Sequence, residues 1–153
     1  MTENTPTLRT VVHLCVSDSA YLSHRLPMAN AAIKDGYKII VCAPDTGHAA
    51  SIQRLDMMFY PLMLDRGGMN PWHDLKSLIA IIKMLRTTQP DILHATGIKP
   101  CLYGGIAAMF SSNIRSLLAL SGLGHMFTGQ PHFPKGLLAA FIGKIIAMTG
   151  NCK

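Results

Sequence analysis

Acidic residues are few in this sequence and absent from its C-terminal part. Residues 1–91 contain nine lysines and arginines against eight acidic residues, whereas residues 92–153 contain five basic residues and no acidic one. The only glutamate is Glu3, so a mechanism that uses a pair of glutamates has no residues in this chain. The basic C-terminal part favours an anionic ligand or surface, whether a phosphate, an anionic lipid or a nucleic acid.

Signatures of several protein classes are missing. No run of eighteen apolar residues occurs and the first ten residues are polar, which argues against a transmembrane helix and a signal peptide. The basic residues form no dense stripe and no aromatic RNA-binding motif accompanies them, so we expect no nucleic acid partner. The first expected strand is not followed by G-x-G-x-x-G, and G-x-x-x-x-G-K-S/T is absent, which disfavours a dinucleotide and excludes a P-loop.

The cysteines lack a pattern typical of a metal site or of disulfides. Cys15, Cys42, Cys101 and Cys152 lie far apart in the sequence, without a C-x-x-C pair or paired histidines. We therefore expect reduced thiols in a cytosolic protein and no bound metal.

Apolar segments alternate with helix-forming segments along the rest of the chain. Helix signals lie between the apolar runs, and we expect strands at 10–16, 37–43, 57–63, 91–95 and 116–120. This order predicts an α/β fold with a doubly wound, Rossmann-like parallel sheet. With 153 residues, 49% of them hydrophobic, the chain is expected to form one domain over residues 10–153 after a disordered tail at 1–9.

Two of the expected helices have distinctive sequences. Residues 17–36 are expected to be helical, with serine and aspartate as caps and Gly36 as a C-terminal stop. A longer helix is expected to begin at Asn70-Pro71, a capping side chain followed by a proline, and to end before Pro90. On this second helix one face carries five apolar residues at helical spacing, namely Leu75, Leu78, Ile79, Ile82 and Leu85.

Candidate binding segments follow three of the expected strands. The carboxyl ends of parallel strands share one edge of a sheet, and ligands bind there. The segments Ser17–Arg25, Thr96–Lys99 and Ser121–His125 are therefore expected to converge. In the turn after the fourth strand, a helix N-terminus beside Lys99 forms a candidate phosphate or carboxylate site. An ordinary turn with a solvated lysine explains the same residues.

The loop after the fifth strand, SGLGHMFTGQ, offers a second candidate. Gly122 and Gly124 would let a ligand approach the backbone closely, and His125 is a candidate acid, base or hydrogen-bond donor. A flexible loop explains the same pattern. Ser121 begins this loop directly after the strand.

Histidines and arginines elsewhere leave alternatives open. For His24 and Arg25 there are two interpretations, binding of an anion or simple solvation. Arg66 is interpreted either as a cation near the site or as an exposed residue of a glycine hinge. His94, at the end of a strand, is a core histidine or a catalytic one. His13 is expected to be structural.

Four segments occur together in an order typical of one enzyme family. They are YLSHRLPMANAAIKDGYKIIVCAP, RGGMNPWHDLKSLIAIIKMLR, PDILHATGIKPCLYGGIAA and LALSGLGHMF. The chain resembles the N-terminal, acceptor-side domain of family 4 glycosyltransferases of the GT-B fold, most closely bacterial enzymes that build capsule, O-antigen or other lipid-linked glycans. The resemblance extends from about Thr10 to about Thr149.

The resemblance implies half of a retaining enzyme that moves a sugar from a nucleotide donor, commonly UDP-linked, to a polyprenyl-diphosphate-linked acceptor without a metal or other cofactor. The expected location is the inner face of the cytoplasmic membrane, with an anionic membrane surface as a further partner. The family's donor domain, which carries a pair of glutamates, has no counterpart in this sequence, so we expect a truncated or split enzyme that is inactive alone. The implied binding residues are Ser23, His24, Arg25, Arg66, Thr96, Gly97, Lys99, Gly122 and Gly124.

The resemblance leaves the catalytic residue open. Many relatives carry a histidine or an acidic residue directly after the fifth strand, where this chain has Ser121. The candidates are therefore His125, Ser121 and His94.

Two other functions remain open. One is a non-catalytic partner of a separate donor-domain chain, recruited to a membrane by the basic and apolar tail around Lys135 and Lys144. Packing of that tail on the second domain also explains its apolar character, and we favour this explanation. The other is an autonomous nucleotide-binding α/β domain.

Overall fold

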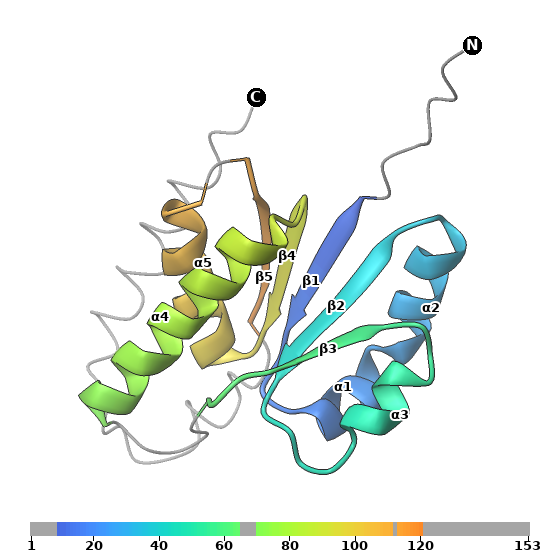
Figure 1. The fold of residues 1–153 in the computed structure, drawn as a ribbon, viewed down its shortest axis with the longest axis horizontal. Helices are drawn as coiled ribbons and strands as arrows, with labels where there is room; N and C mark the ends of the chain where they lie inside the picture. Colours follow the sequence, from blue (N-terminus) through green and yellow to red (C-terminus); the bar gives the residue numbers. More distant parts are fainter. Residues whose placement is uncertain (1–8, 65–69, 112, 121–153) are drawn as a thin grey trace.

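The computed structural model describes residues 9–64, 70–111 and 113–120, and strands and helices alternate along them (Figure 1). The strands are β1 (Thr10–Leu14), β2 (Lys38–Ala43), β3 (Met58–Pro61), β4 (Ile92–Thr96) and β5 (Arg115–Ala119). The helices are α1 (Asp18–His24), α2 (Leu26–Lys34), α3 (Ala49–Gln53), α4 (Pro71–Thr88) and α5 (Ile98–Met109). The tail expected at 1–9 lies outside the described residues except for Arg9, and the loop and helix expected after residue 120 lie outside them entirely.

The five strands form one parallel sheet in the order β3-β2-β1-β4-β5. β1 is central: Val12 is paired with Ile40 of β2 on one side and with Leu93 of β4 on the other. This arrangement confirms the predicted doubly wound α/β fold. The short apolar strands fit a parallel sheet because both of its faces are covered and a strand then needs no polar side.

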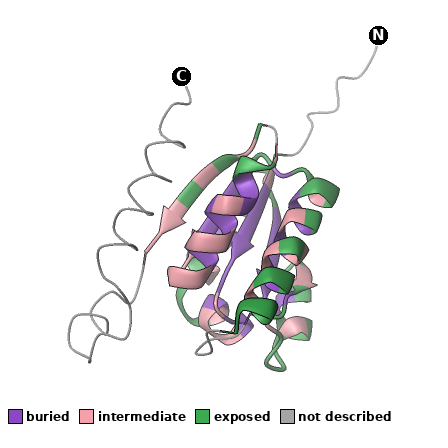
Figure 2. Cartoon of the chain, turned by 90° about the vertical axis from the view of Figure 1, so that its left-hand side faces the viewer, coloured by how far each residue is buried: buried purple, intermediate pink, exposed green. Residues whose placement is uncertain are grey.

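Helices cover both faces of the sheet and divide the core into two clusters (Figures 1 and 2). α4 and α5 pack on one face over a cluster that includes Leu14, Leu93 and Met84. α1, α2 and α3 pack on the other face over a cluster that includes Tyr21 and Val41. Alternate residues of β1 point to opposite faces, so this strand contributes to both clusters.

The helix expected over residues 17–36 is divided into α1 and α2 at Arg25. The Arg25 N–H donates to the Tyr21 carbonyl at 2.8 Å and ends α1, and the Ala29 N–H donates to the Arg25 carbonyl at 3.0 Å in α2. Pro27 lies in the first turn of α2 and has no N–H to donate to the carbonyl of Ser23. The continuous helix predicted from the sequence is therefore wrong, because a proline interrupts its hydrogen bonding.

The start of α4 is as predicted. The Asn70 side chain accepts a hydrogen bond from the Trp72 N–H at 3.1 Å, and Pro71 is the first helical residue. A proline fits here because the first N–H groups of a helix have no carbonyl partner within it.

The apolar face predicted for α4 is only partly buried. The buried residues of the helix are Ser77, Ile81, Met84 and Leu85, whereas Leu75 and Ile79 are exposed. The side of α4 that packs against α5 and the core is therefore rotated from the side with most apolar residues. Ser77 is accommodated in this stripe because its hydroxyl donates to the carbonyls of Met63 and His73 at 2.6 and 2.9 Å. The result is a helix with apolar side chains on its outer side as well.

Candidate functional site

The carboxyl edge of the sheet brings the segments after β1 and β4 side by side. β1 and β4 are neighbours in the sheet, but β1 continues into α1 on one face while β4 continues into α5 on the other. In α/β proteins, ligands bind at the carboxyl ends of strands whose connections reverse in this way. The structure therefore brings together two of the three segments that the sequence predicted to converge, and Ser121–His125 lies outside the described residues.

The N-terminus of α1 has no backbone donor left for a ligand. Each of its first four N–H groups has an acceptor within the chain: Asp18 donates to the Pro44 carbonyl at 3.3 Å, Ser19 to the Asp18 carboxylate at 2.6 Å, Ala20 to the Ser17 hydroxyl at 3.1 Å, and Tyr21 to the Ser17 carbonyl at 3.1 Å. In dinucleotide-binding folds these groups hold the pyrophosphate. The first turn of this chain is therefore closed to a phosphate.

Asp18 joins the first turn to the segment after β2. Its buried carboxylate accepts hydrogen bonds from the Thr46 N–H at 2.8 Å, the His48 N–H at 2.9 Å and the Thr46 hydroxyl. Burial alone would raise the pKa of Asp18, but these hydrogen bonds outweigh it and hold the pKa at about 2. Asp18 is thus an ionised internal anion at the positive end of a helix.

The turn after β4 has a different construction. Its N-cap, Gly97, has a φ of +104° and provides no side chain to cap α5. A Cβ at this position would lie 2.7 Å from Cγ1 of Val16, so the turn after β1 and the turn after β4 touch here. The buried hydroxyl of the neighbouring Thr96 has no hydrogen-bond partner among the described residues. An unpaired buried hydroxyl is costly, and the Ser116 hydroxyl on β5 likewise has no partner among the described residues.

Lys99 lies between α5 and α4 and forms an ion pair. Its Nζ donates to Oδ1 of Asp74 at 3.1 Å, and both side chains are mostly buried. Asp74 also raises the pKa of Tyr103, since burial and the nearby carboxylate both favour the neutral phenol. A lysine held in this way is not the solvated lysine of an ordinary turn, and its contact with a ligand anion stays a prediction.

Two buried histidines from neighbouring strands lie side by side in the sheet. His13 and His94 are paired in the sheet, and their rings lie edge to face with centroids 5.3 Å apart. Nδ1 of His13 and the Tyr21 hydroxyl lie 2.9 Å apart in a hydrogen bond, and this hydroxyl donates to the sulfur of Met57 at 3.4 Å. The structure thus supports the structural role predicted for His13.

The electrostatic surroundings keep both histidines neutral. Burial, the neighbouring His94 and the positive charge of Arg25 lower the pKa of His13 to about 4. Burial and Arg25 also lower the pKa of His94. A neutral imidazole donates one hydrogen bond and accepts another. His94 is buried in β4, two residues before the strand ends at Thr96. It therefore fits the core histidine of the two alternatives, and a catalytic role stays a prediction.

The remaining candidate residues are divided between the surface and the segments that are not described. Ser23 and His24 are exposed on α1, and the Ser23 hydroxyl donates to the Ser19 carbonyl at 3.0 Å. Arg25 is partly exposed between α1 and α2. The other candidates lie outside the described residues: Arg66, Ser121, Gly122, Gly124 and His125.

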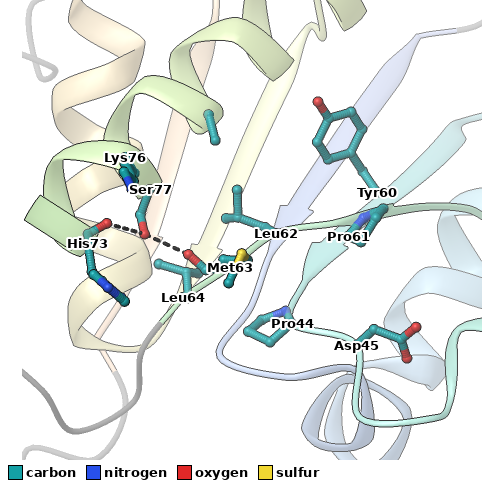
Figure 3. Close-up of a pocket in the computed structure, with 11 residues that line it drawn as sticks. Pro44, Asp45, Tyr60, Pro61, Leu62, Met63, Leu64, His73, Lys76 and Ser77 are labelled. Carbon is teal, nitrogen blue, oxygen red and sulfur yellow. Dashed lines mark hydrogen bonds between the residues drawn. The ribbon is translucent and has the colours of Figure 1, made fainter.

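A cavity of about 880 Å³ opens between the ends of β2 and β3 and the first turns of α4. Figure 3 shows His73 and Lys76 of α4 on one side and Tyr60 of β3 on the other. The floor is apolar and includes Leu62 and Leu64. An apolar pocket with a few polar side chains at its rim is the common form of a small-molecule site.

Sequence reasoning missed this cavity and the long-range contacts of two carboxylates, Asp18 and Asp74, near the carboxyl edge of the sheet. The cavity depends on the spacing between β3 and α4, which no local pattern specifies. Asp18 was visible only as a helix cap, and its partners Thr46 and His48 lie 28 and 30 residues away. Asp74 lies in the first turn of α4, and no local pattern indicates its partner Lys99, which is 25 residues away.

Metal-binding and membrane-spanning features are not found in the described parts. No group of three or more histidine, cysteine, aspartate or glutamate residues there could hold a metal ion. Within the same residues, no helix combines the length and apolar character needed to cross a membrane. Cys15, Cys42 and Cys101 are buried free thiols, as predicted, and burial raises the pKa of each; Cys152 lies outside the described residues.

Comparison with known proteins identifies related folds. Residues 11–148 match the family model of glycosyl transferase 4-like proteins. A glycosyltransferase from Rickettsia africae ESF-5 has a TM-score of 0.59 and 15% identity, covering 73% of this chain and 29% of its own. MurG of Acinetobacter baumannii has a TM-score of 0.60 and 16% identity, covering 87% of this chain and 38% of its own. A UDP-N-acetylglucosamine 2-epimerase has a TM-score of 0.58 and 16% identity, covering 90% and 40%.

These structures share the α/β fold with this chain, and their low sequence identity limits the likeness to the fold. The chain spans less than half the length of each of the three. No curated protein matches its sequence.

Proposed function

The chain belongs to the glycosyl transferase 4-like family, and from this premise we propose that it is the acceptor-side half of a GT-B glycosyltransferase. The acceptor is a glycan linked to a polyprenyl diphosphate at the cytoplasmic face of the membrane. A separate domain or chain binds the nucleotide sugar, commonly UDP-linked, and the transfer retains the anomeric configuration without a metal. This half alone does not complete a transfer.

The observation that carries the proposal is the contrast between the two turns at the carboxyl edge. The N-terminus of α1 is closed to phosphates by Asp18 and Ser17, which argues against a nucleotide on this half. The turn at Gly97 has no side-chain cap and lies beside the hydroxyl of Thr96, which has no hydrogen-bond partner among the described residues. This difference between the two turns supports binding of an acceptor beside Gly97 and Thr96, with Lys99 close to its anionic group.

The cavity next to α4 supports the same assignment. It is lined mostly by apolar side chains, with Lys76 and His73 on α4 and Asp45 after β2. The side formed by α4 suits a molecule with both apolar and anionic parts. A nucleotide sugar offers no extended apolar part. The proposal therefore uses the cavity for the acceptor and leaves the donor to the other half.

A binding experiment with the full chain tests the assignment. A water-soluble, short-chain prenyl-diphosphate sugar and a UDP-sugar are titrated separately and followed by calorimetry. We expect saturable binding of the prenyl diphosphate only. Tighter binding of the UDP-sugar would refute the proposal and support the autonomous nucleotide-binding domain instead.

Two substitutions with opposite effects test the contact by Lys99. Lys99→Gln removes the cation and is expected to lower the affinity for the prenyl diphosphate by about tenfold, the effect of one charge-assisted hydrogen bond. Asp74→Asn releases Lys99 from its ion pair and is expected to raise the affinity. Lys34→Gln, an exposed lysine on α2, is the matched control. If Lys99 only stabilises α5 against α4, both site variants will lower the stability and leave the affinity unchanged.

A transfer assay tests the need for a second half. Purified chain, a UDP-sugar and the lipid-linked acceptor are expected to give no product. Product formed by this chain alone would contradict the proposed division between acceptor and donor halves. Product formed only after a donor-domain chain is added would identify a split enzyme.

A further inference from the structure

The wall that α4 gives to the cavity changes from basic to apolar along the helix. This wall is formed by His73, Lys76, Ser77 and Ala80, and helical periodicity places the four residues in one line along α4. His73 and Lys76 come first in this line, and Ala80 follows one turn after Lys76. The basic side chains of the wall therefore lie toward the start of α4, and its apolar part lies beyond them.

Of the two polar residues in the middle of this wall, only Lys76 is available to a ligand anion. The buried Ser77 hydroxyl donates to the carbonyls of Met63 and His73 at 2.6 and 2.9 Å. Because a hydroxyl has a single proton, Ser77 has no donor left for a ligand. Lys76 is exposed and forms no ion pair with another described residue. The positive charge that a ligand meets on this wall is therefore that of Lys76.

The opposite wall of the cavity is apolar along most of its length. It consists of residues at the end of β3 and directly after it, namely Tyr60, Pro61, Leu62, Met63 and Leu64. The acidic residue of the lining, Asp45, lies on the loop after β2, across from His73 and Lys76 (Figure 3). Its Oδ1 accepts a hydrogen bond from the Gly47 N–H at 2.8 Å, within its own loop. A ligand that extends from Lys76 into the cavity therefore meets mainly apolar side chains.

The volume of the cavity limits the size of the ligand part that it holds. The cavity measures about 880 Å³. At about 30 Å³ for each non-hydrogen atom, the volume that a water molecule takes in the liquid, it accommodates a diphosphate joined to about three isoprene units. A single exposed lysine contributes little to binding, whereas each buried apolar carbon contributes in proportion to its area. The apolar walls therefore dominate the selectivity of this cavity.

From this polarity and this volume we propose that the cavity binds the first isoprene units of the lipid-linked acceptor and measures their number. The diphosphate contacts Lys76 and His73, and about three isoprene units lie between Ala80 and the apolar wall at Leu62. Isoprene units beyond the third lie outside the cavity and contact no part of it. The inference rests on the proposed function, which it deepens by assigning the lipid part of the acceptor, rather than its sugar, to this cavity.

A ligand series with one diphosphate sugar and one to five isoprene units tests the inference. Each ligand is titrated into the full chain by calorimetry, without vesicles and below the critical micelle concentration. We expect the affinity to rise roughly tenfold with each unit up to the third, because the open cavity buries part of each unit. From the third unit to the fifth we expect the affinity to stay constant within about twofold.

Two variants reduce the apolar part of the cavity and keep Lys76. Ala80→Phe fills space comparable to one isoprene unit and is expected to lower the affinity for the three-unit ligand about tenfold, without changing the affinity for the one-unit ligand. Ala31→Phe on the exposed side of α2 is its matched control. Met63→Ser shortens an apolar side chain that is 87% exposed, so the core is undisturbed, and is expected to act in the same direction.

A third variant changes the charge at the start of the wall. Lys76→Gln is expected to lower the affinity for every ligand of the series by the same factor, since all of them carry the same diphosphate. Lys34→Gln on α2 is its control. Circular dichroism of every variant verifies that the fold is retained.

The outcomes separate this inference from the proposed function. An affinity that does not depend on the number of isoprene units would overturn the inference and leave the acceptor assignment standing. The same holds for an affinity that keeps rising tenfold per unit beyond the third, and for folded Ala80→Phe and Met63→Ser chains that bind the whole series like the unchanged chain. If no ligand of the series binds, the acceptor assignment itself is wrong, and the inference that rests on it is wrong as well.

Discussion

Among single residues, Gly97 has the most restricted environment. Its φ of +104° is unfavourable for any residue with a side chain, and a Cβ would also approach Cγ1 of Val16 to 2.7 Å. Gly47 has a similar φ of +101°, but no atom lies within 4 Å of its Cβ position. Substitutions at the two glycines can therefore separate the effect of backbone strain on stability from the effect of close packing.

We predict that Gly97→Ala lowers the free energy of unfolding by about 3 kcal/mol and Gly47→Ala by about 1 kcal/mol. Both variants carry the backbone strain, and only Gly97→Ala adds the overpacking against Val16. Urea unfolding at neutral pH measures both values. Equal losses would show that the contact between the two turns is loose.

The pKa of His13 predicts how stability depends on pH. Its value falls from 6.5 to about 4 on folding, first through burial and then through His94 and Arg25. The folded state thus favours the neutral ring. The contribution of His13 to the free energy of unfolding is therefore complete above pH 6.5 and is lost as the pH falls toward 4. The full loss for this buried group is about 3 kcal/mol.

We predict that His13→Gln flattens the stability profile between pH 6.5 and pH 4, because the amide does not titrate. Urea unfolding at the two ends of this range measures the change, and the exposed His24→Gln serves as the control. A profile for His13→Gln parallel to that of the unchanged chain would contradict the assignment of this pH dependence to His13.

At the scale of elements, α4 shows which structural features were accessible from the sequence. The start at Asn70-Pro71 and the end before Pro90 were predictable because capping and proline chemistry are local. The buried side was not, because Leu75 and Ile79 fit a helical apolar face as well as Ile81 and Met84 do. Which face packs inward depends on where β3 ends and on the hydrogen bonds of Ser77 to Met63 and His73.

We predict that Asn70→Ala lowers the free energy of unfolding by about 1 kcal/mol, the usual effect of losing a side-chain cap. The lost interaction is the 3.1 Å hydrogen bond from the Trp72 N–H to the Asn70 side chain. Asn30→Ala on the exposed side of α2 is the control, and alanine's higher helix propensity should leave it equal or slightly more stable. A similar loss in both variants would contradict a capping role for Asn70.

The same distinction holds for the candidate site. The convergence of the turns after β1 and β4 was predictable because a parallel sheet requires it. The partners were not: Asp18 with Thr46 and Lys99 with Asp74 are contacts between distant segments. Arg66, Ser121, Gly122, Gly124 and His125 lie outside the described residues, so their assignments stay predictions.

For the whole molecule, the central position of β1 makes the two core clusters interdependent. Leu14 of β1 belongs to the cluster under α4 and α5, and Val11 of the same strand to the cluster under α1 to α3. Loss of packing on one face therefore weakens the strand on which the other face is built. The described domain is expected to unfold in one cooperative transition.

We predict that Leu93→Ala, a buried change under α5, lowers the free energy of unfolding by about 3 kcal/mol. Hydrogen exchange of amides in α2, on the opposite face, should accelerate to match this loss. Leu117→Ala, on β5 and 58% exposed, is the control and should have little effect. Unchanged protection of α2 in Leu93→Ala would show that the two faces unfold independently.

The closed first turn of α1 also determines how this half responds to ligands. A ligand raises the melting temperature of a protein only to the extent that it binds the folded state more tightly than the unfolded chain. The carboxylate of Asp18 already lies at the N-terminus of α1, and the N–H groups of the first turn already have acceptors. A phosphate would therefore gain no binding free energy there. We therefore expect no thermal shift from phosphate binding at that turn, so a shift caused by a ligand would report on binding elsewhere, such as the cavity beside α4.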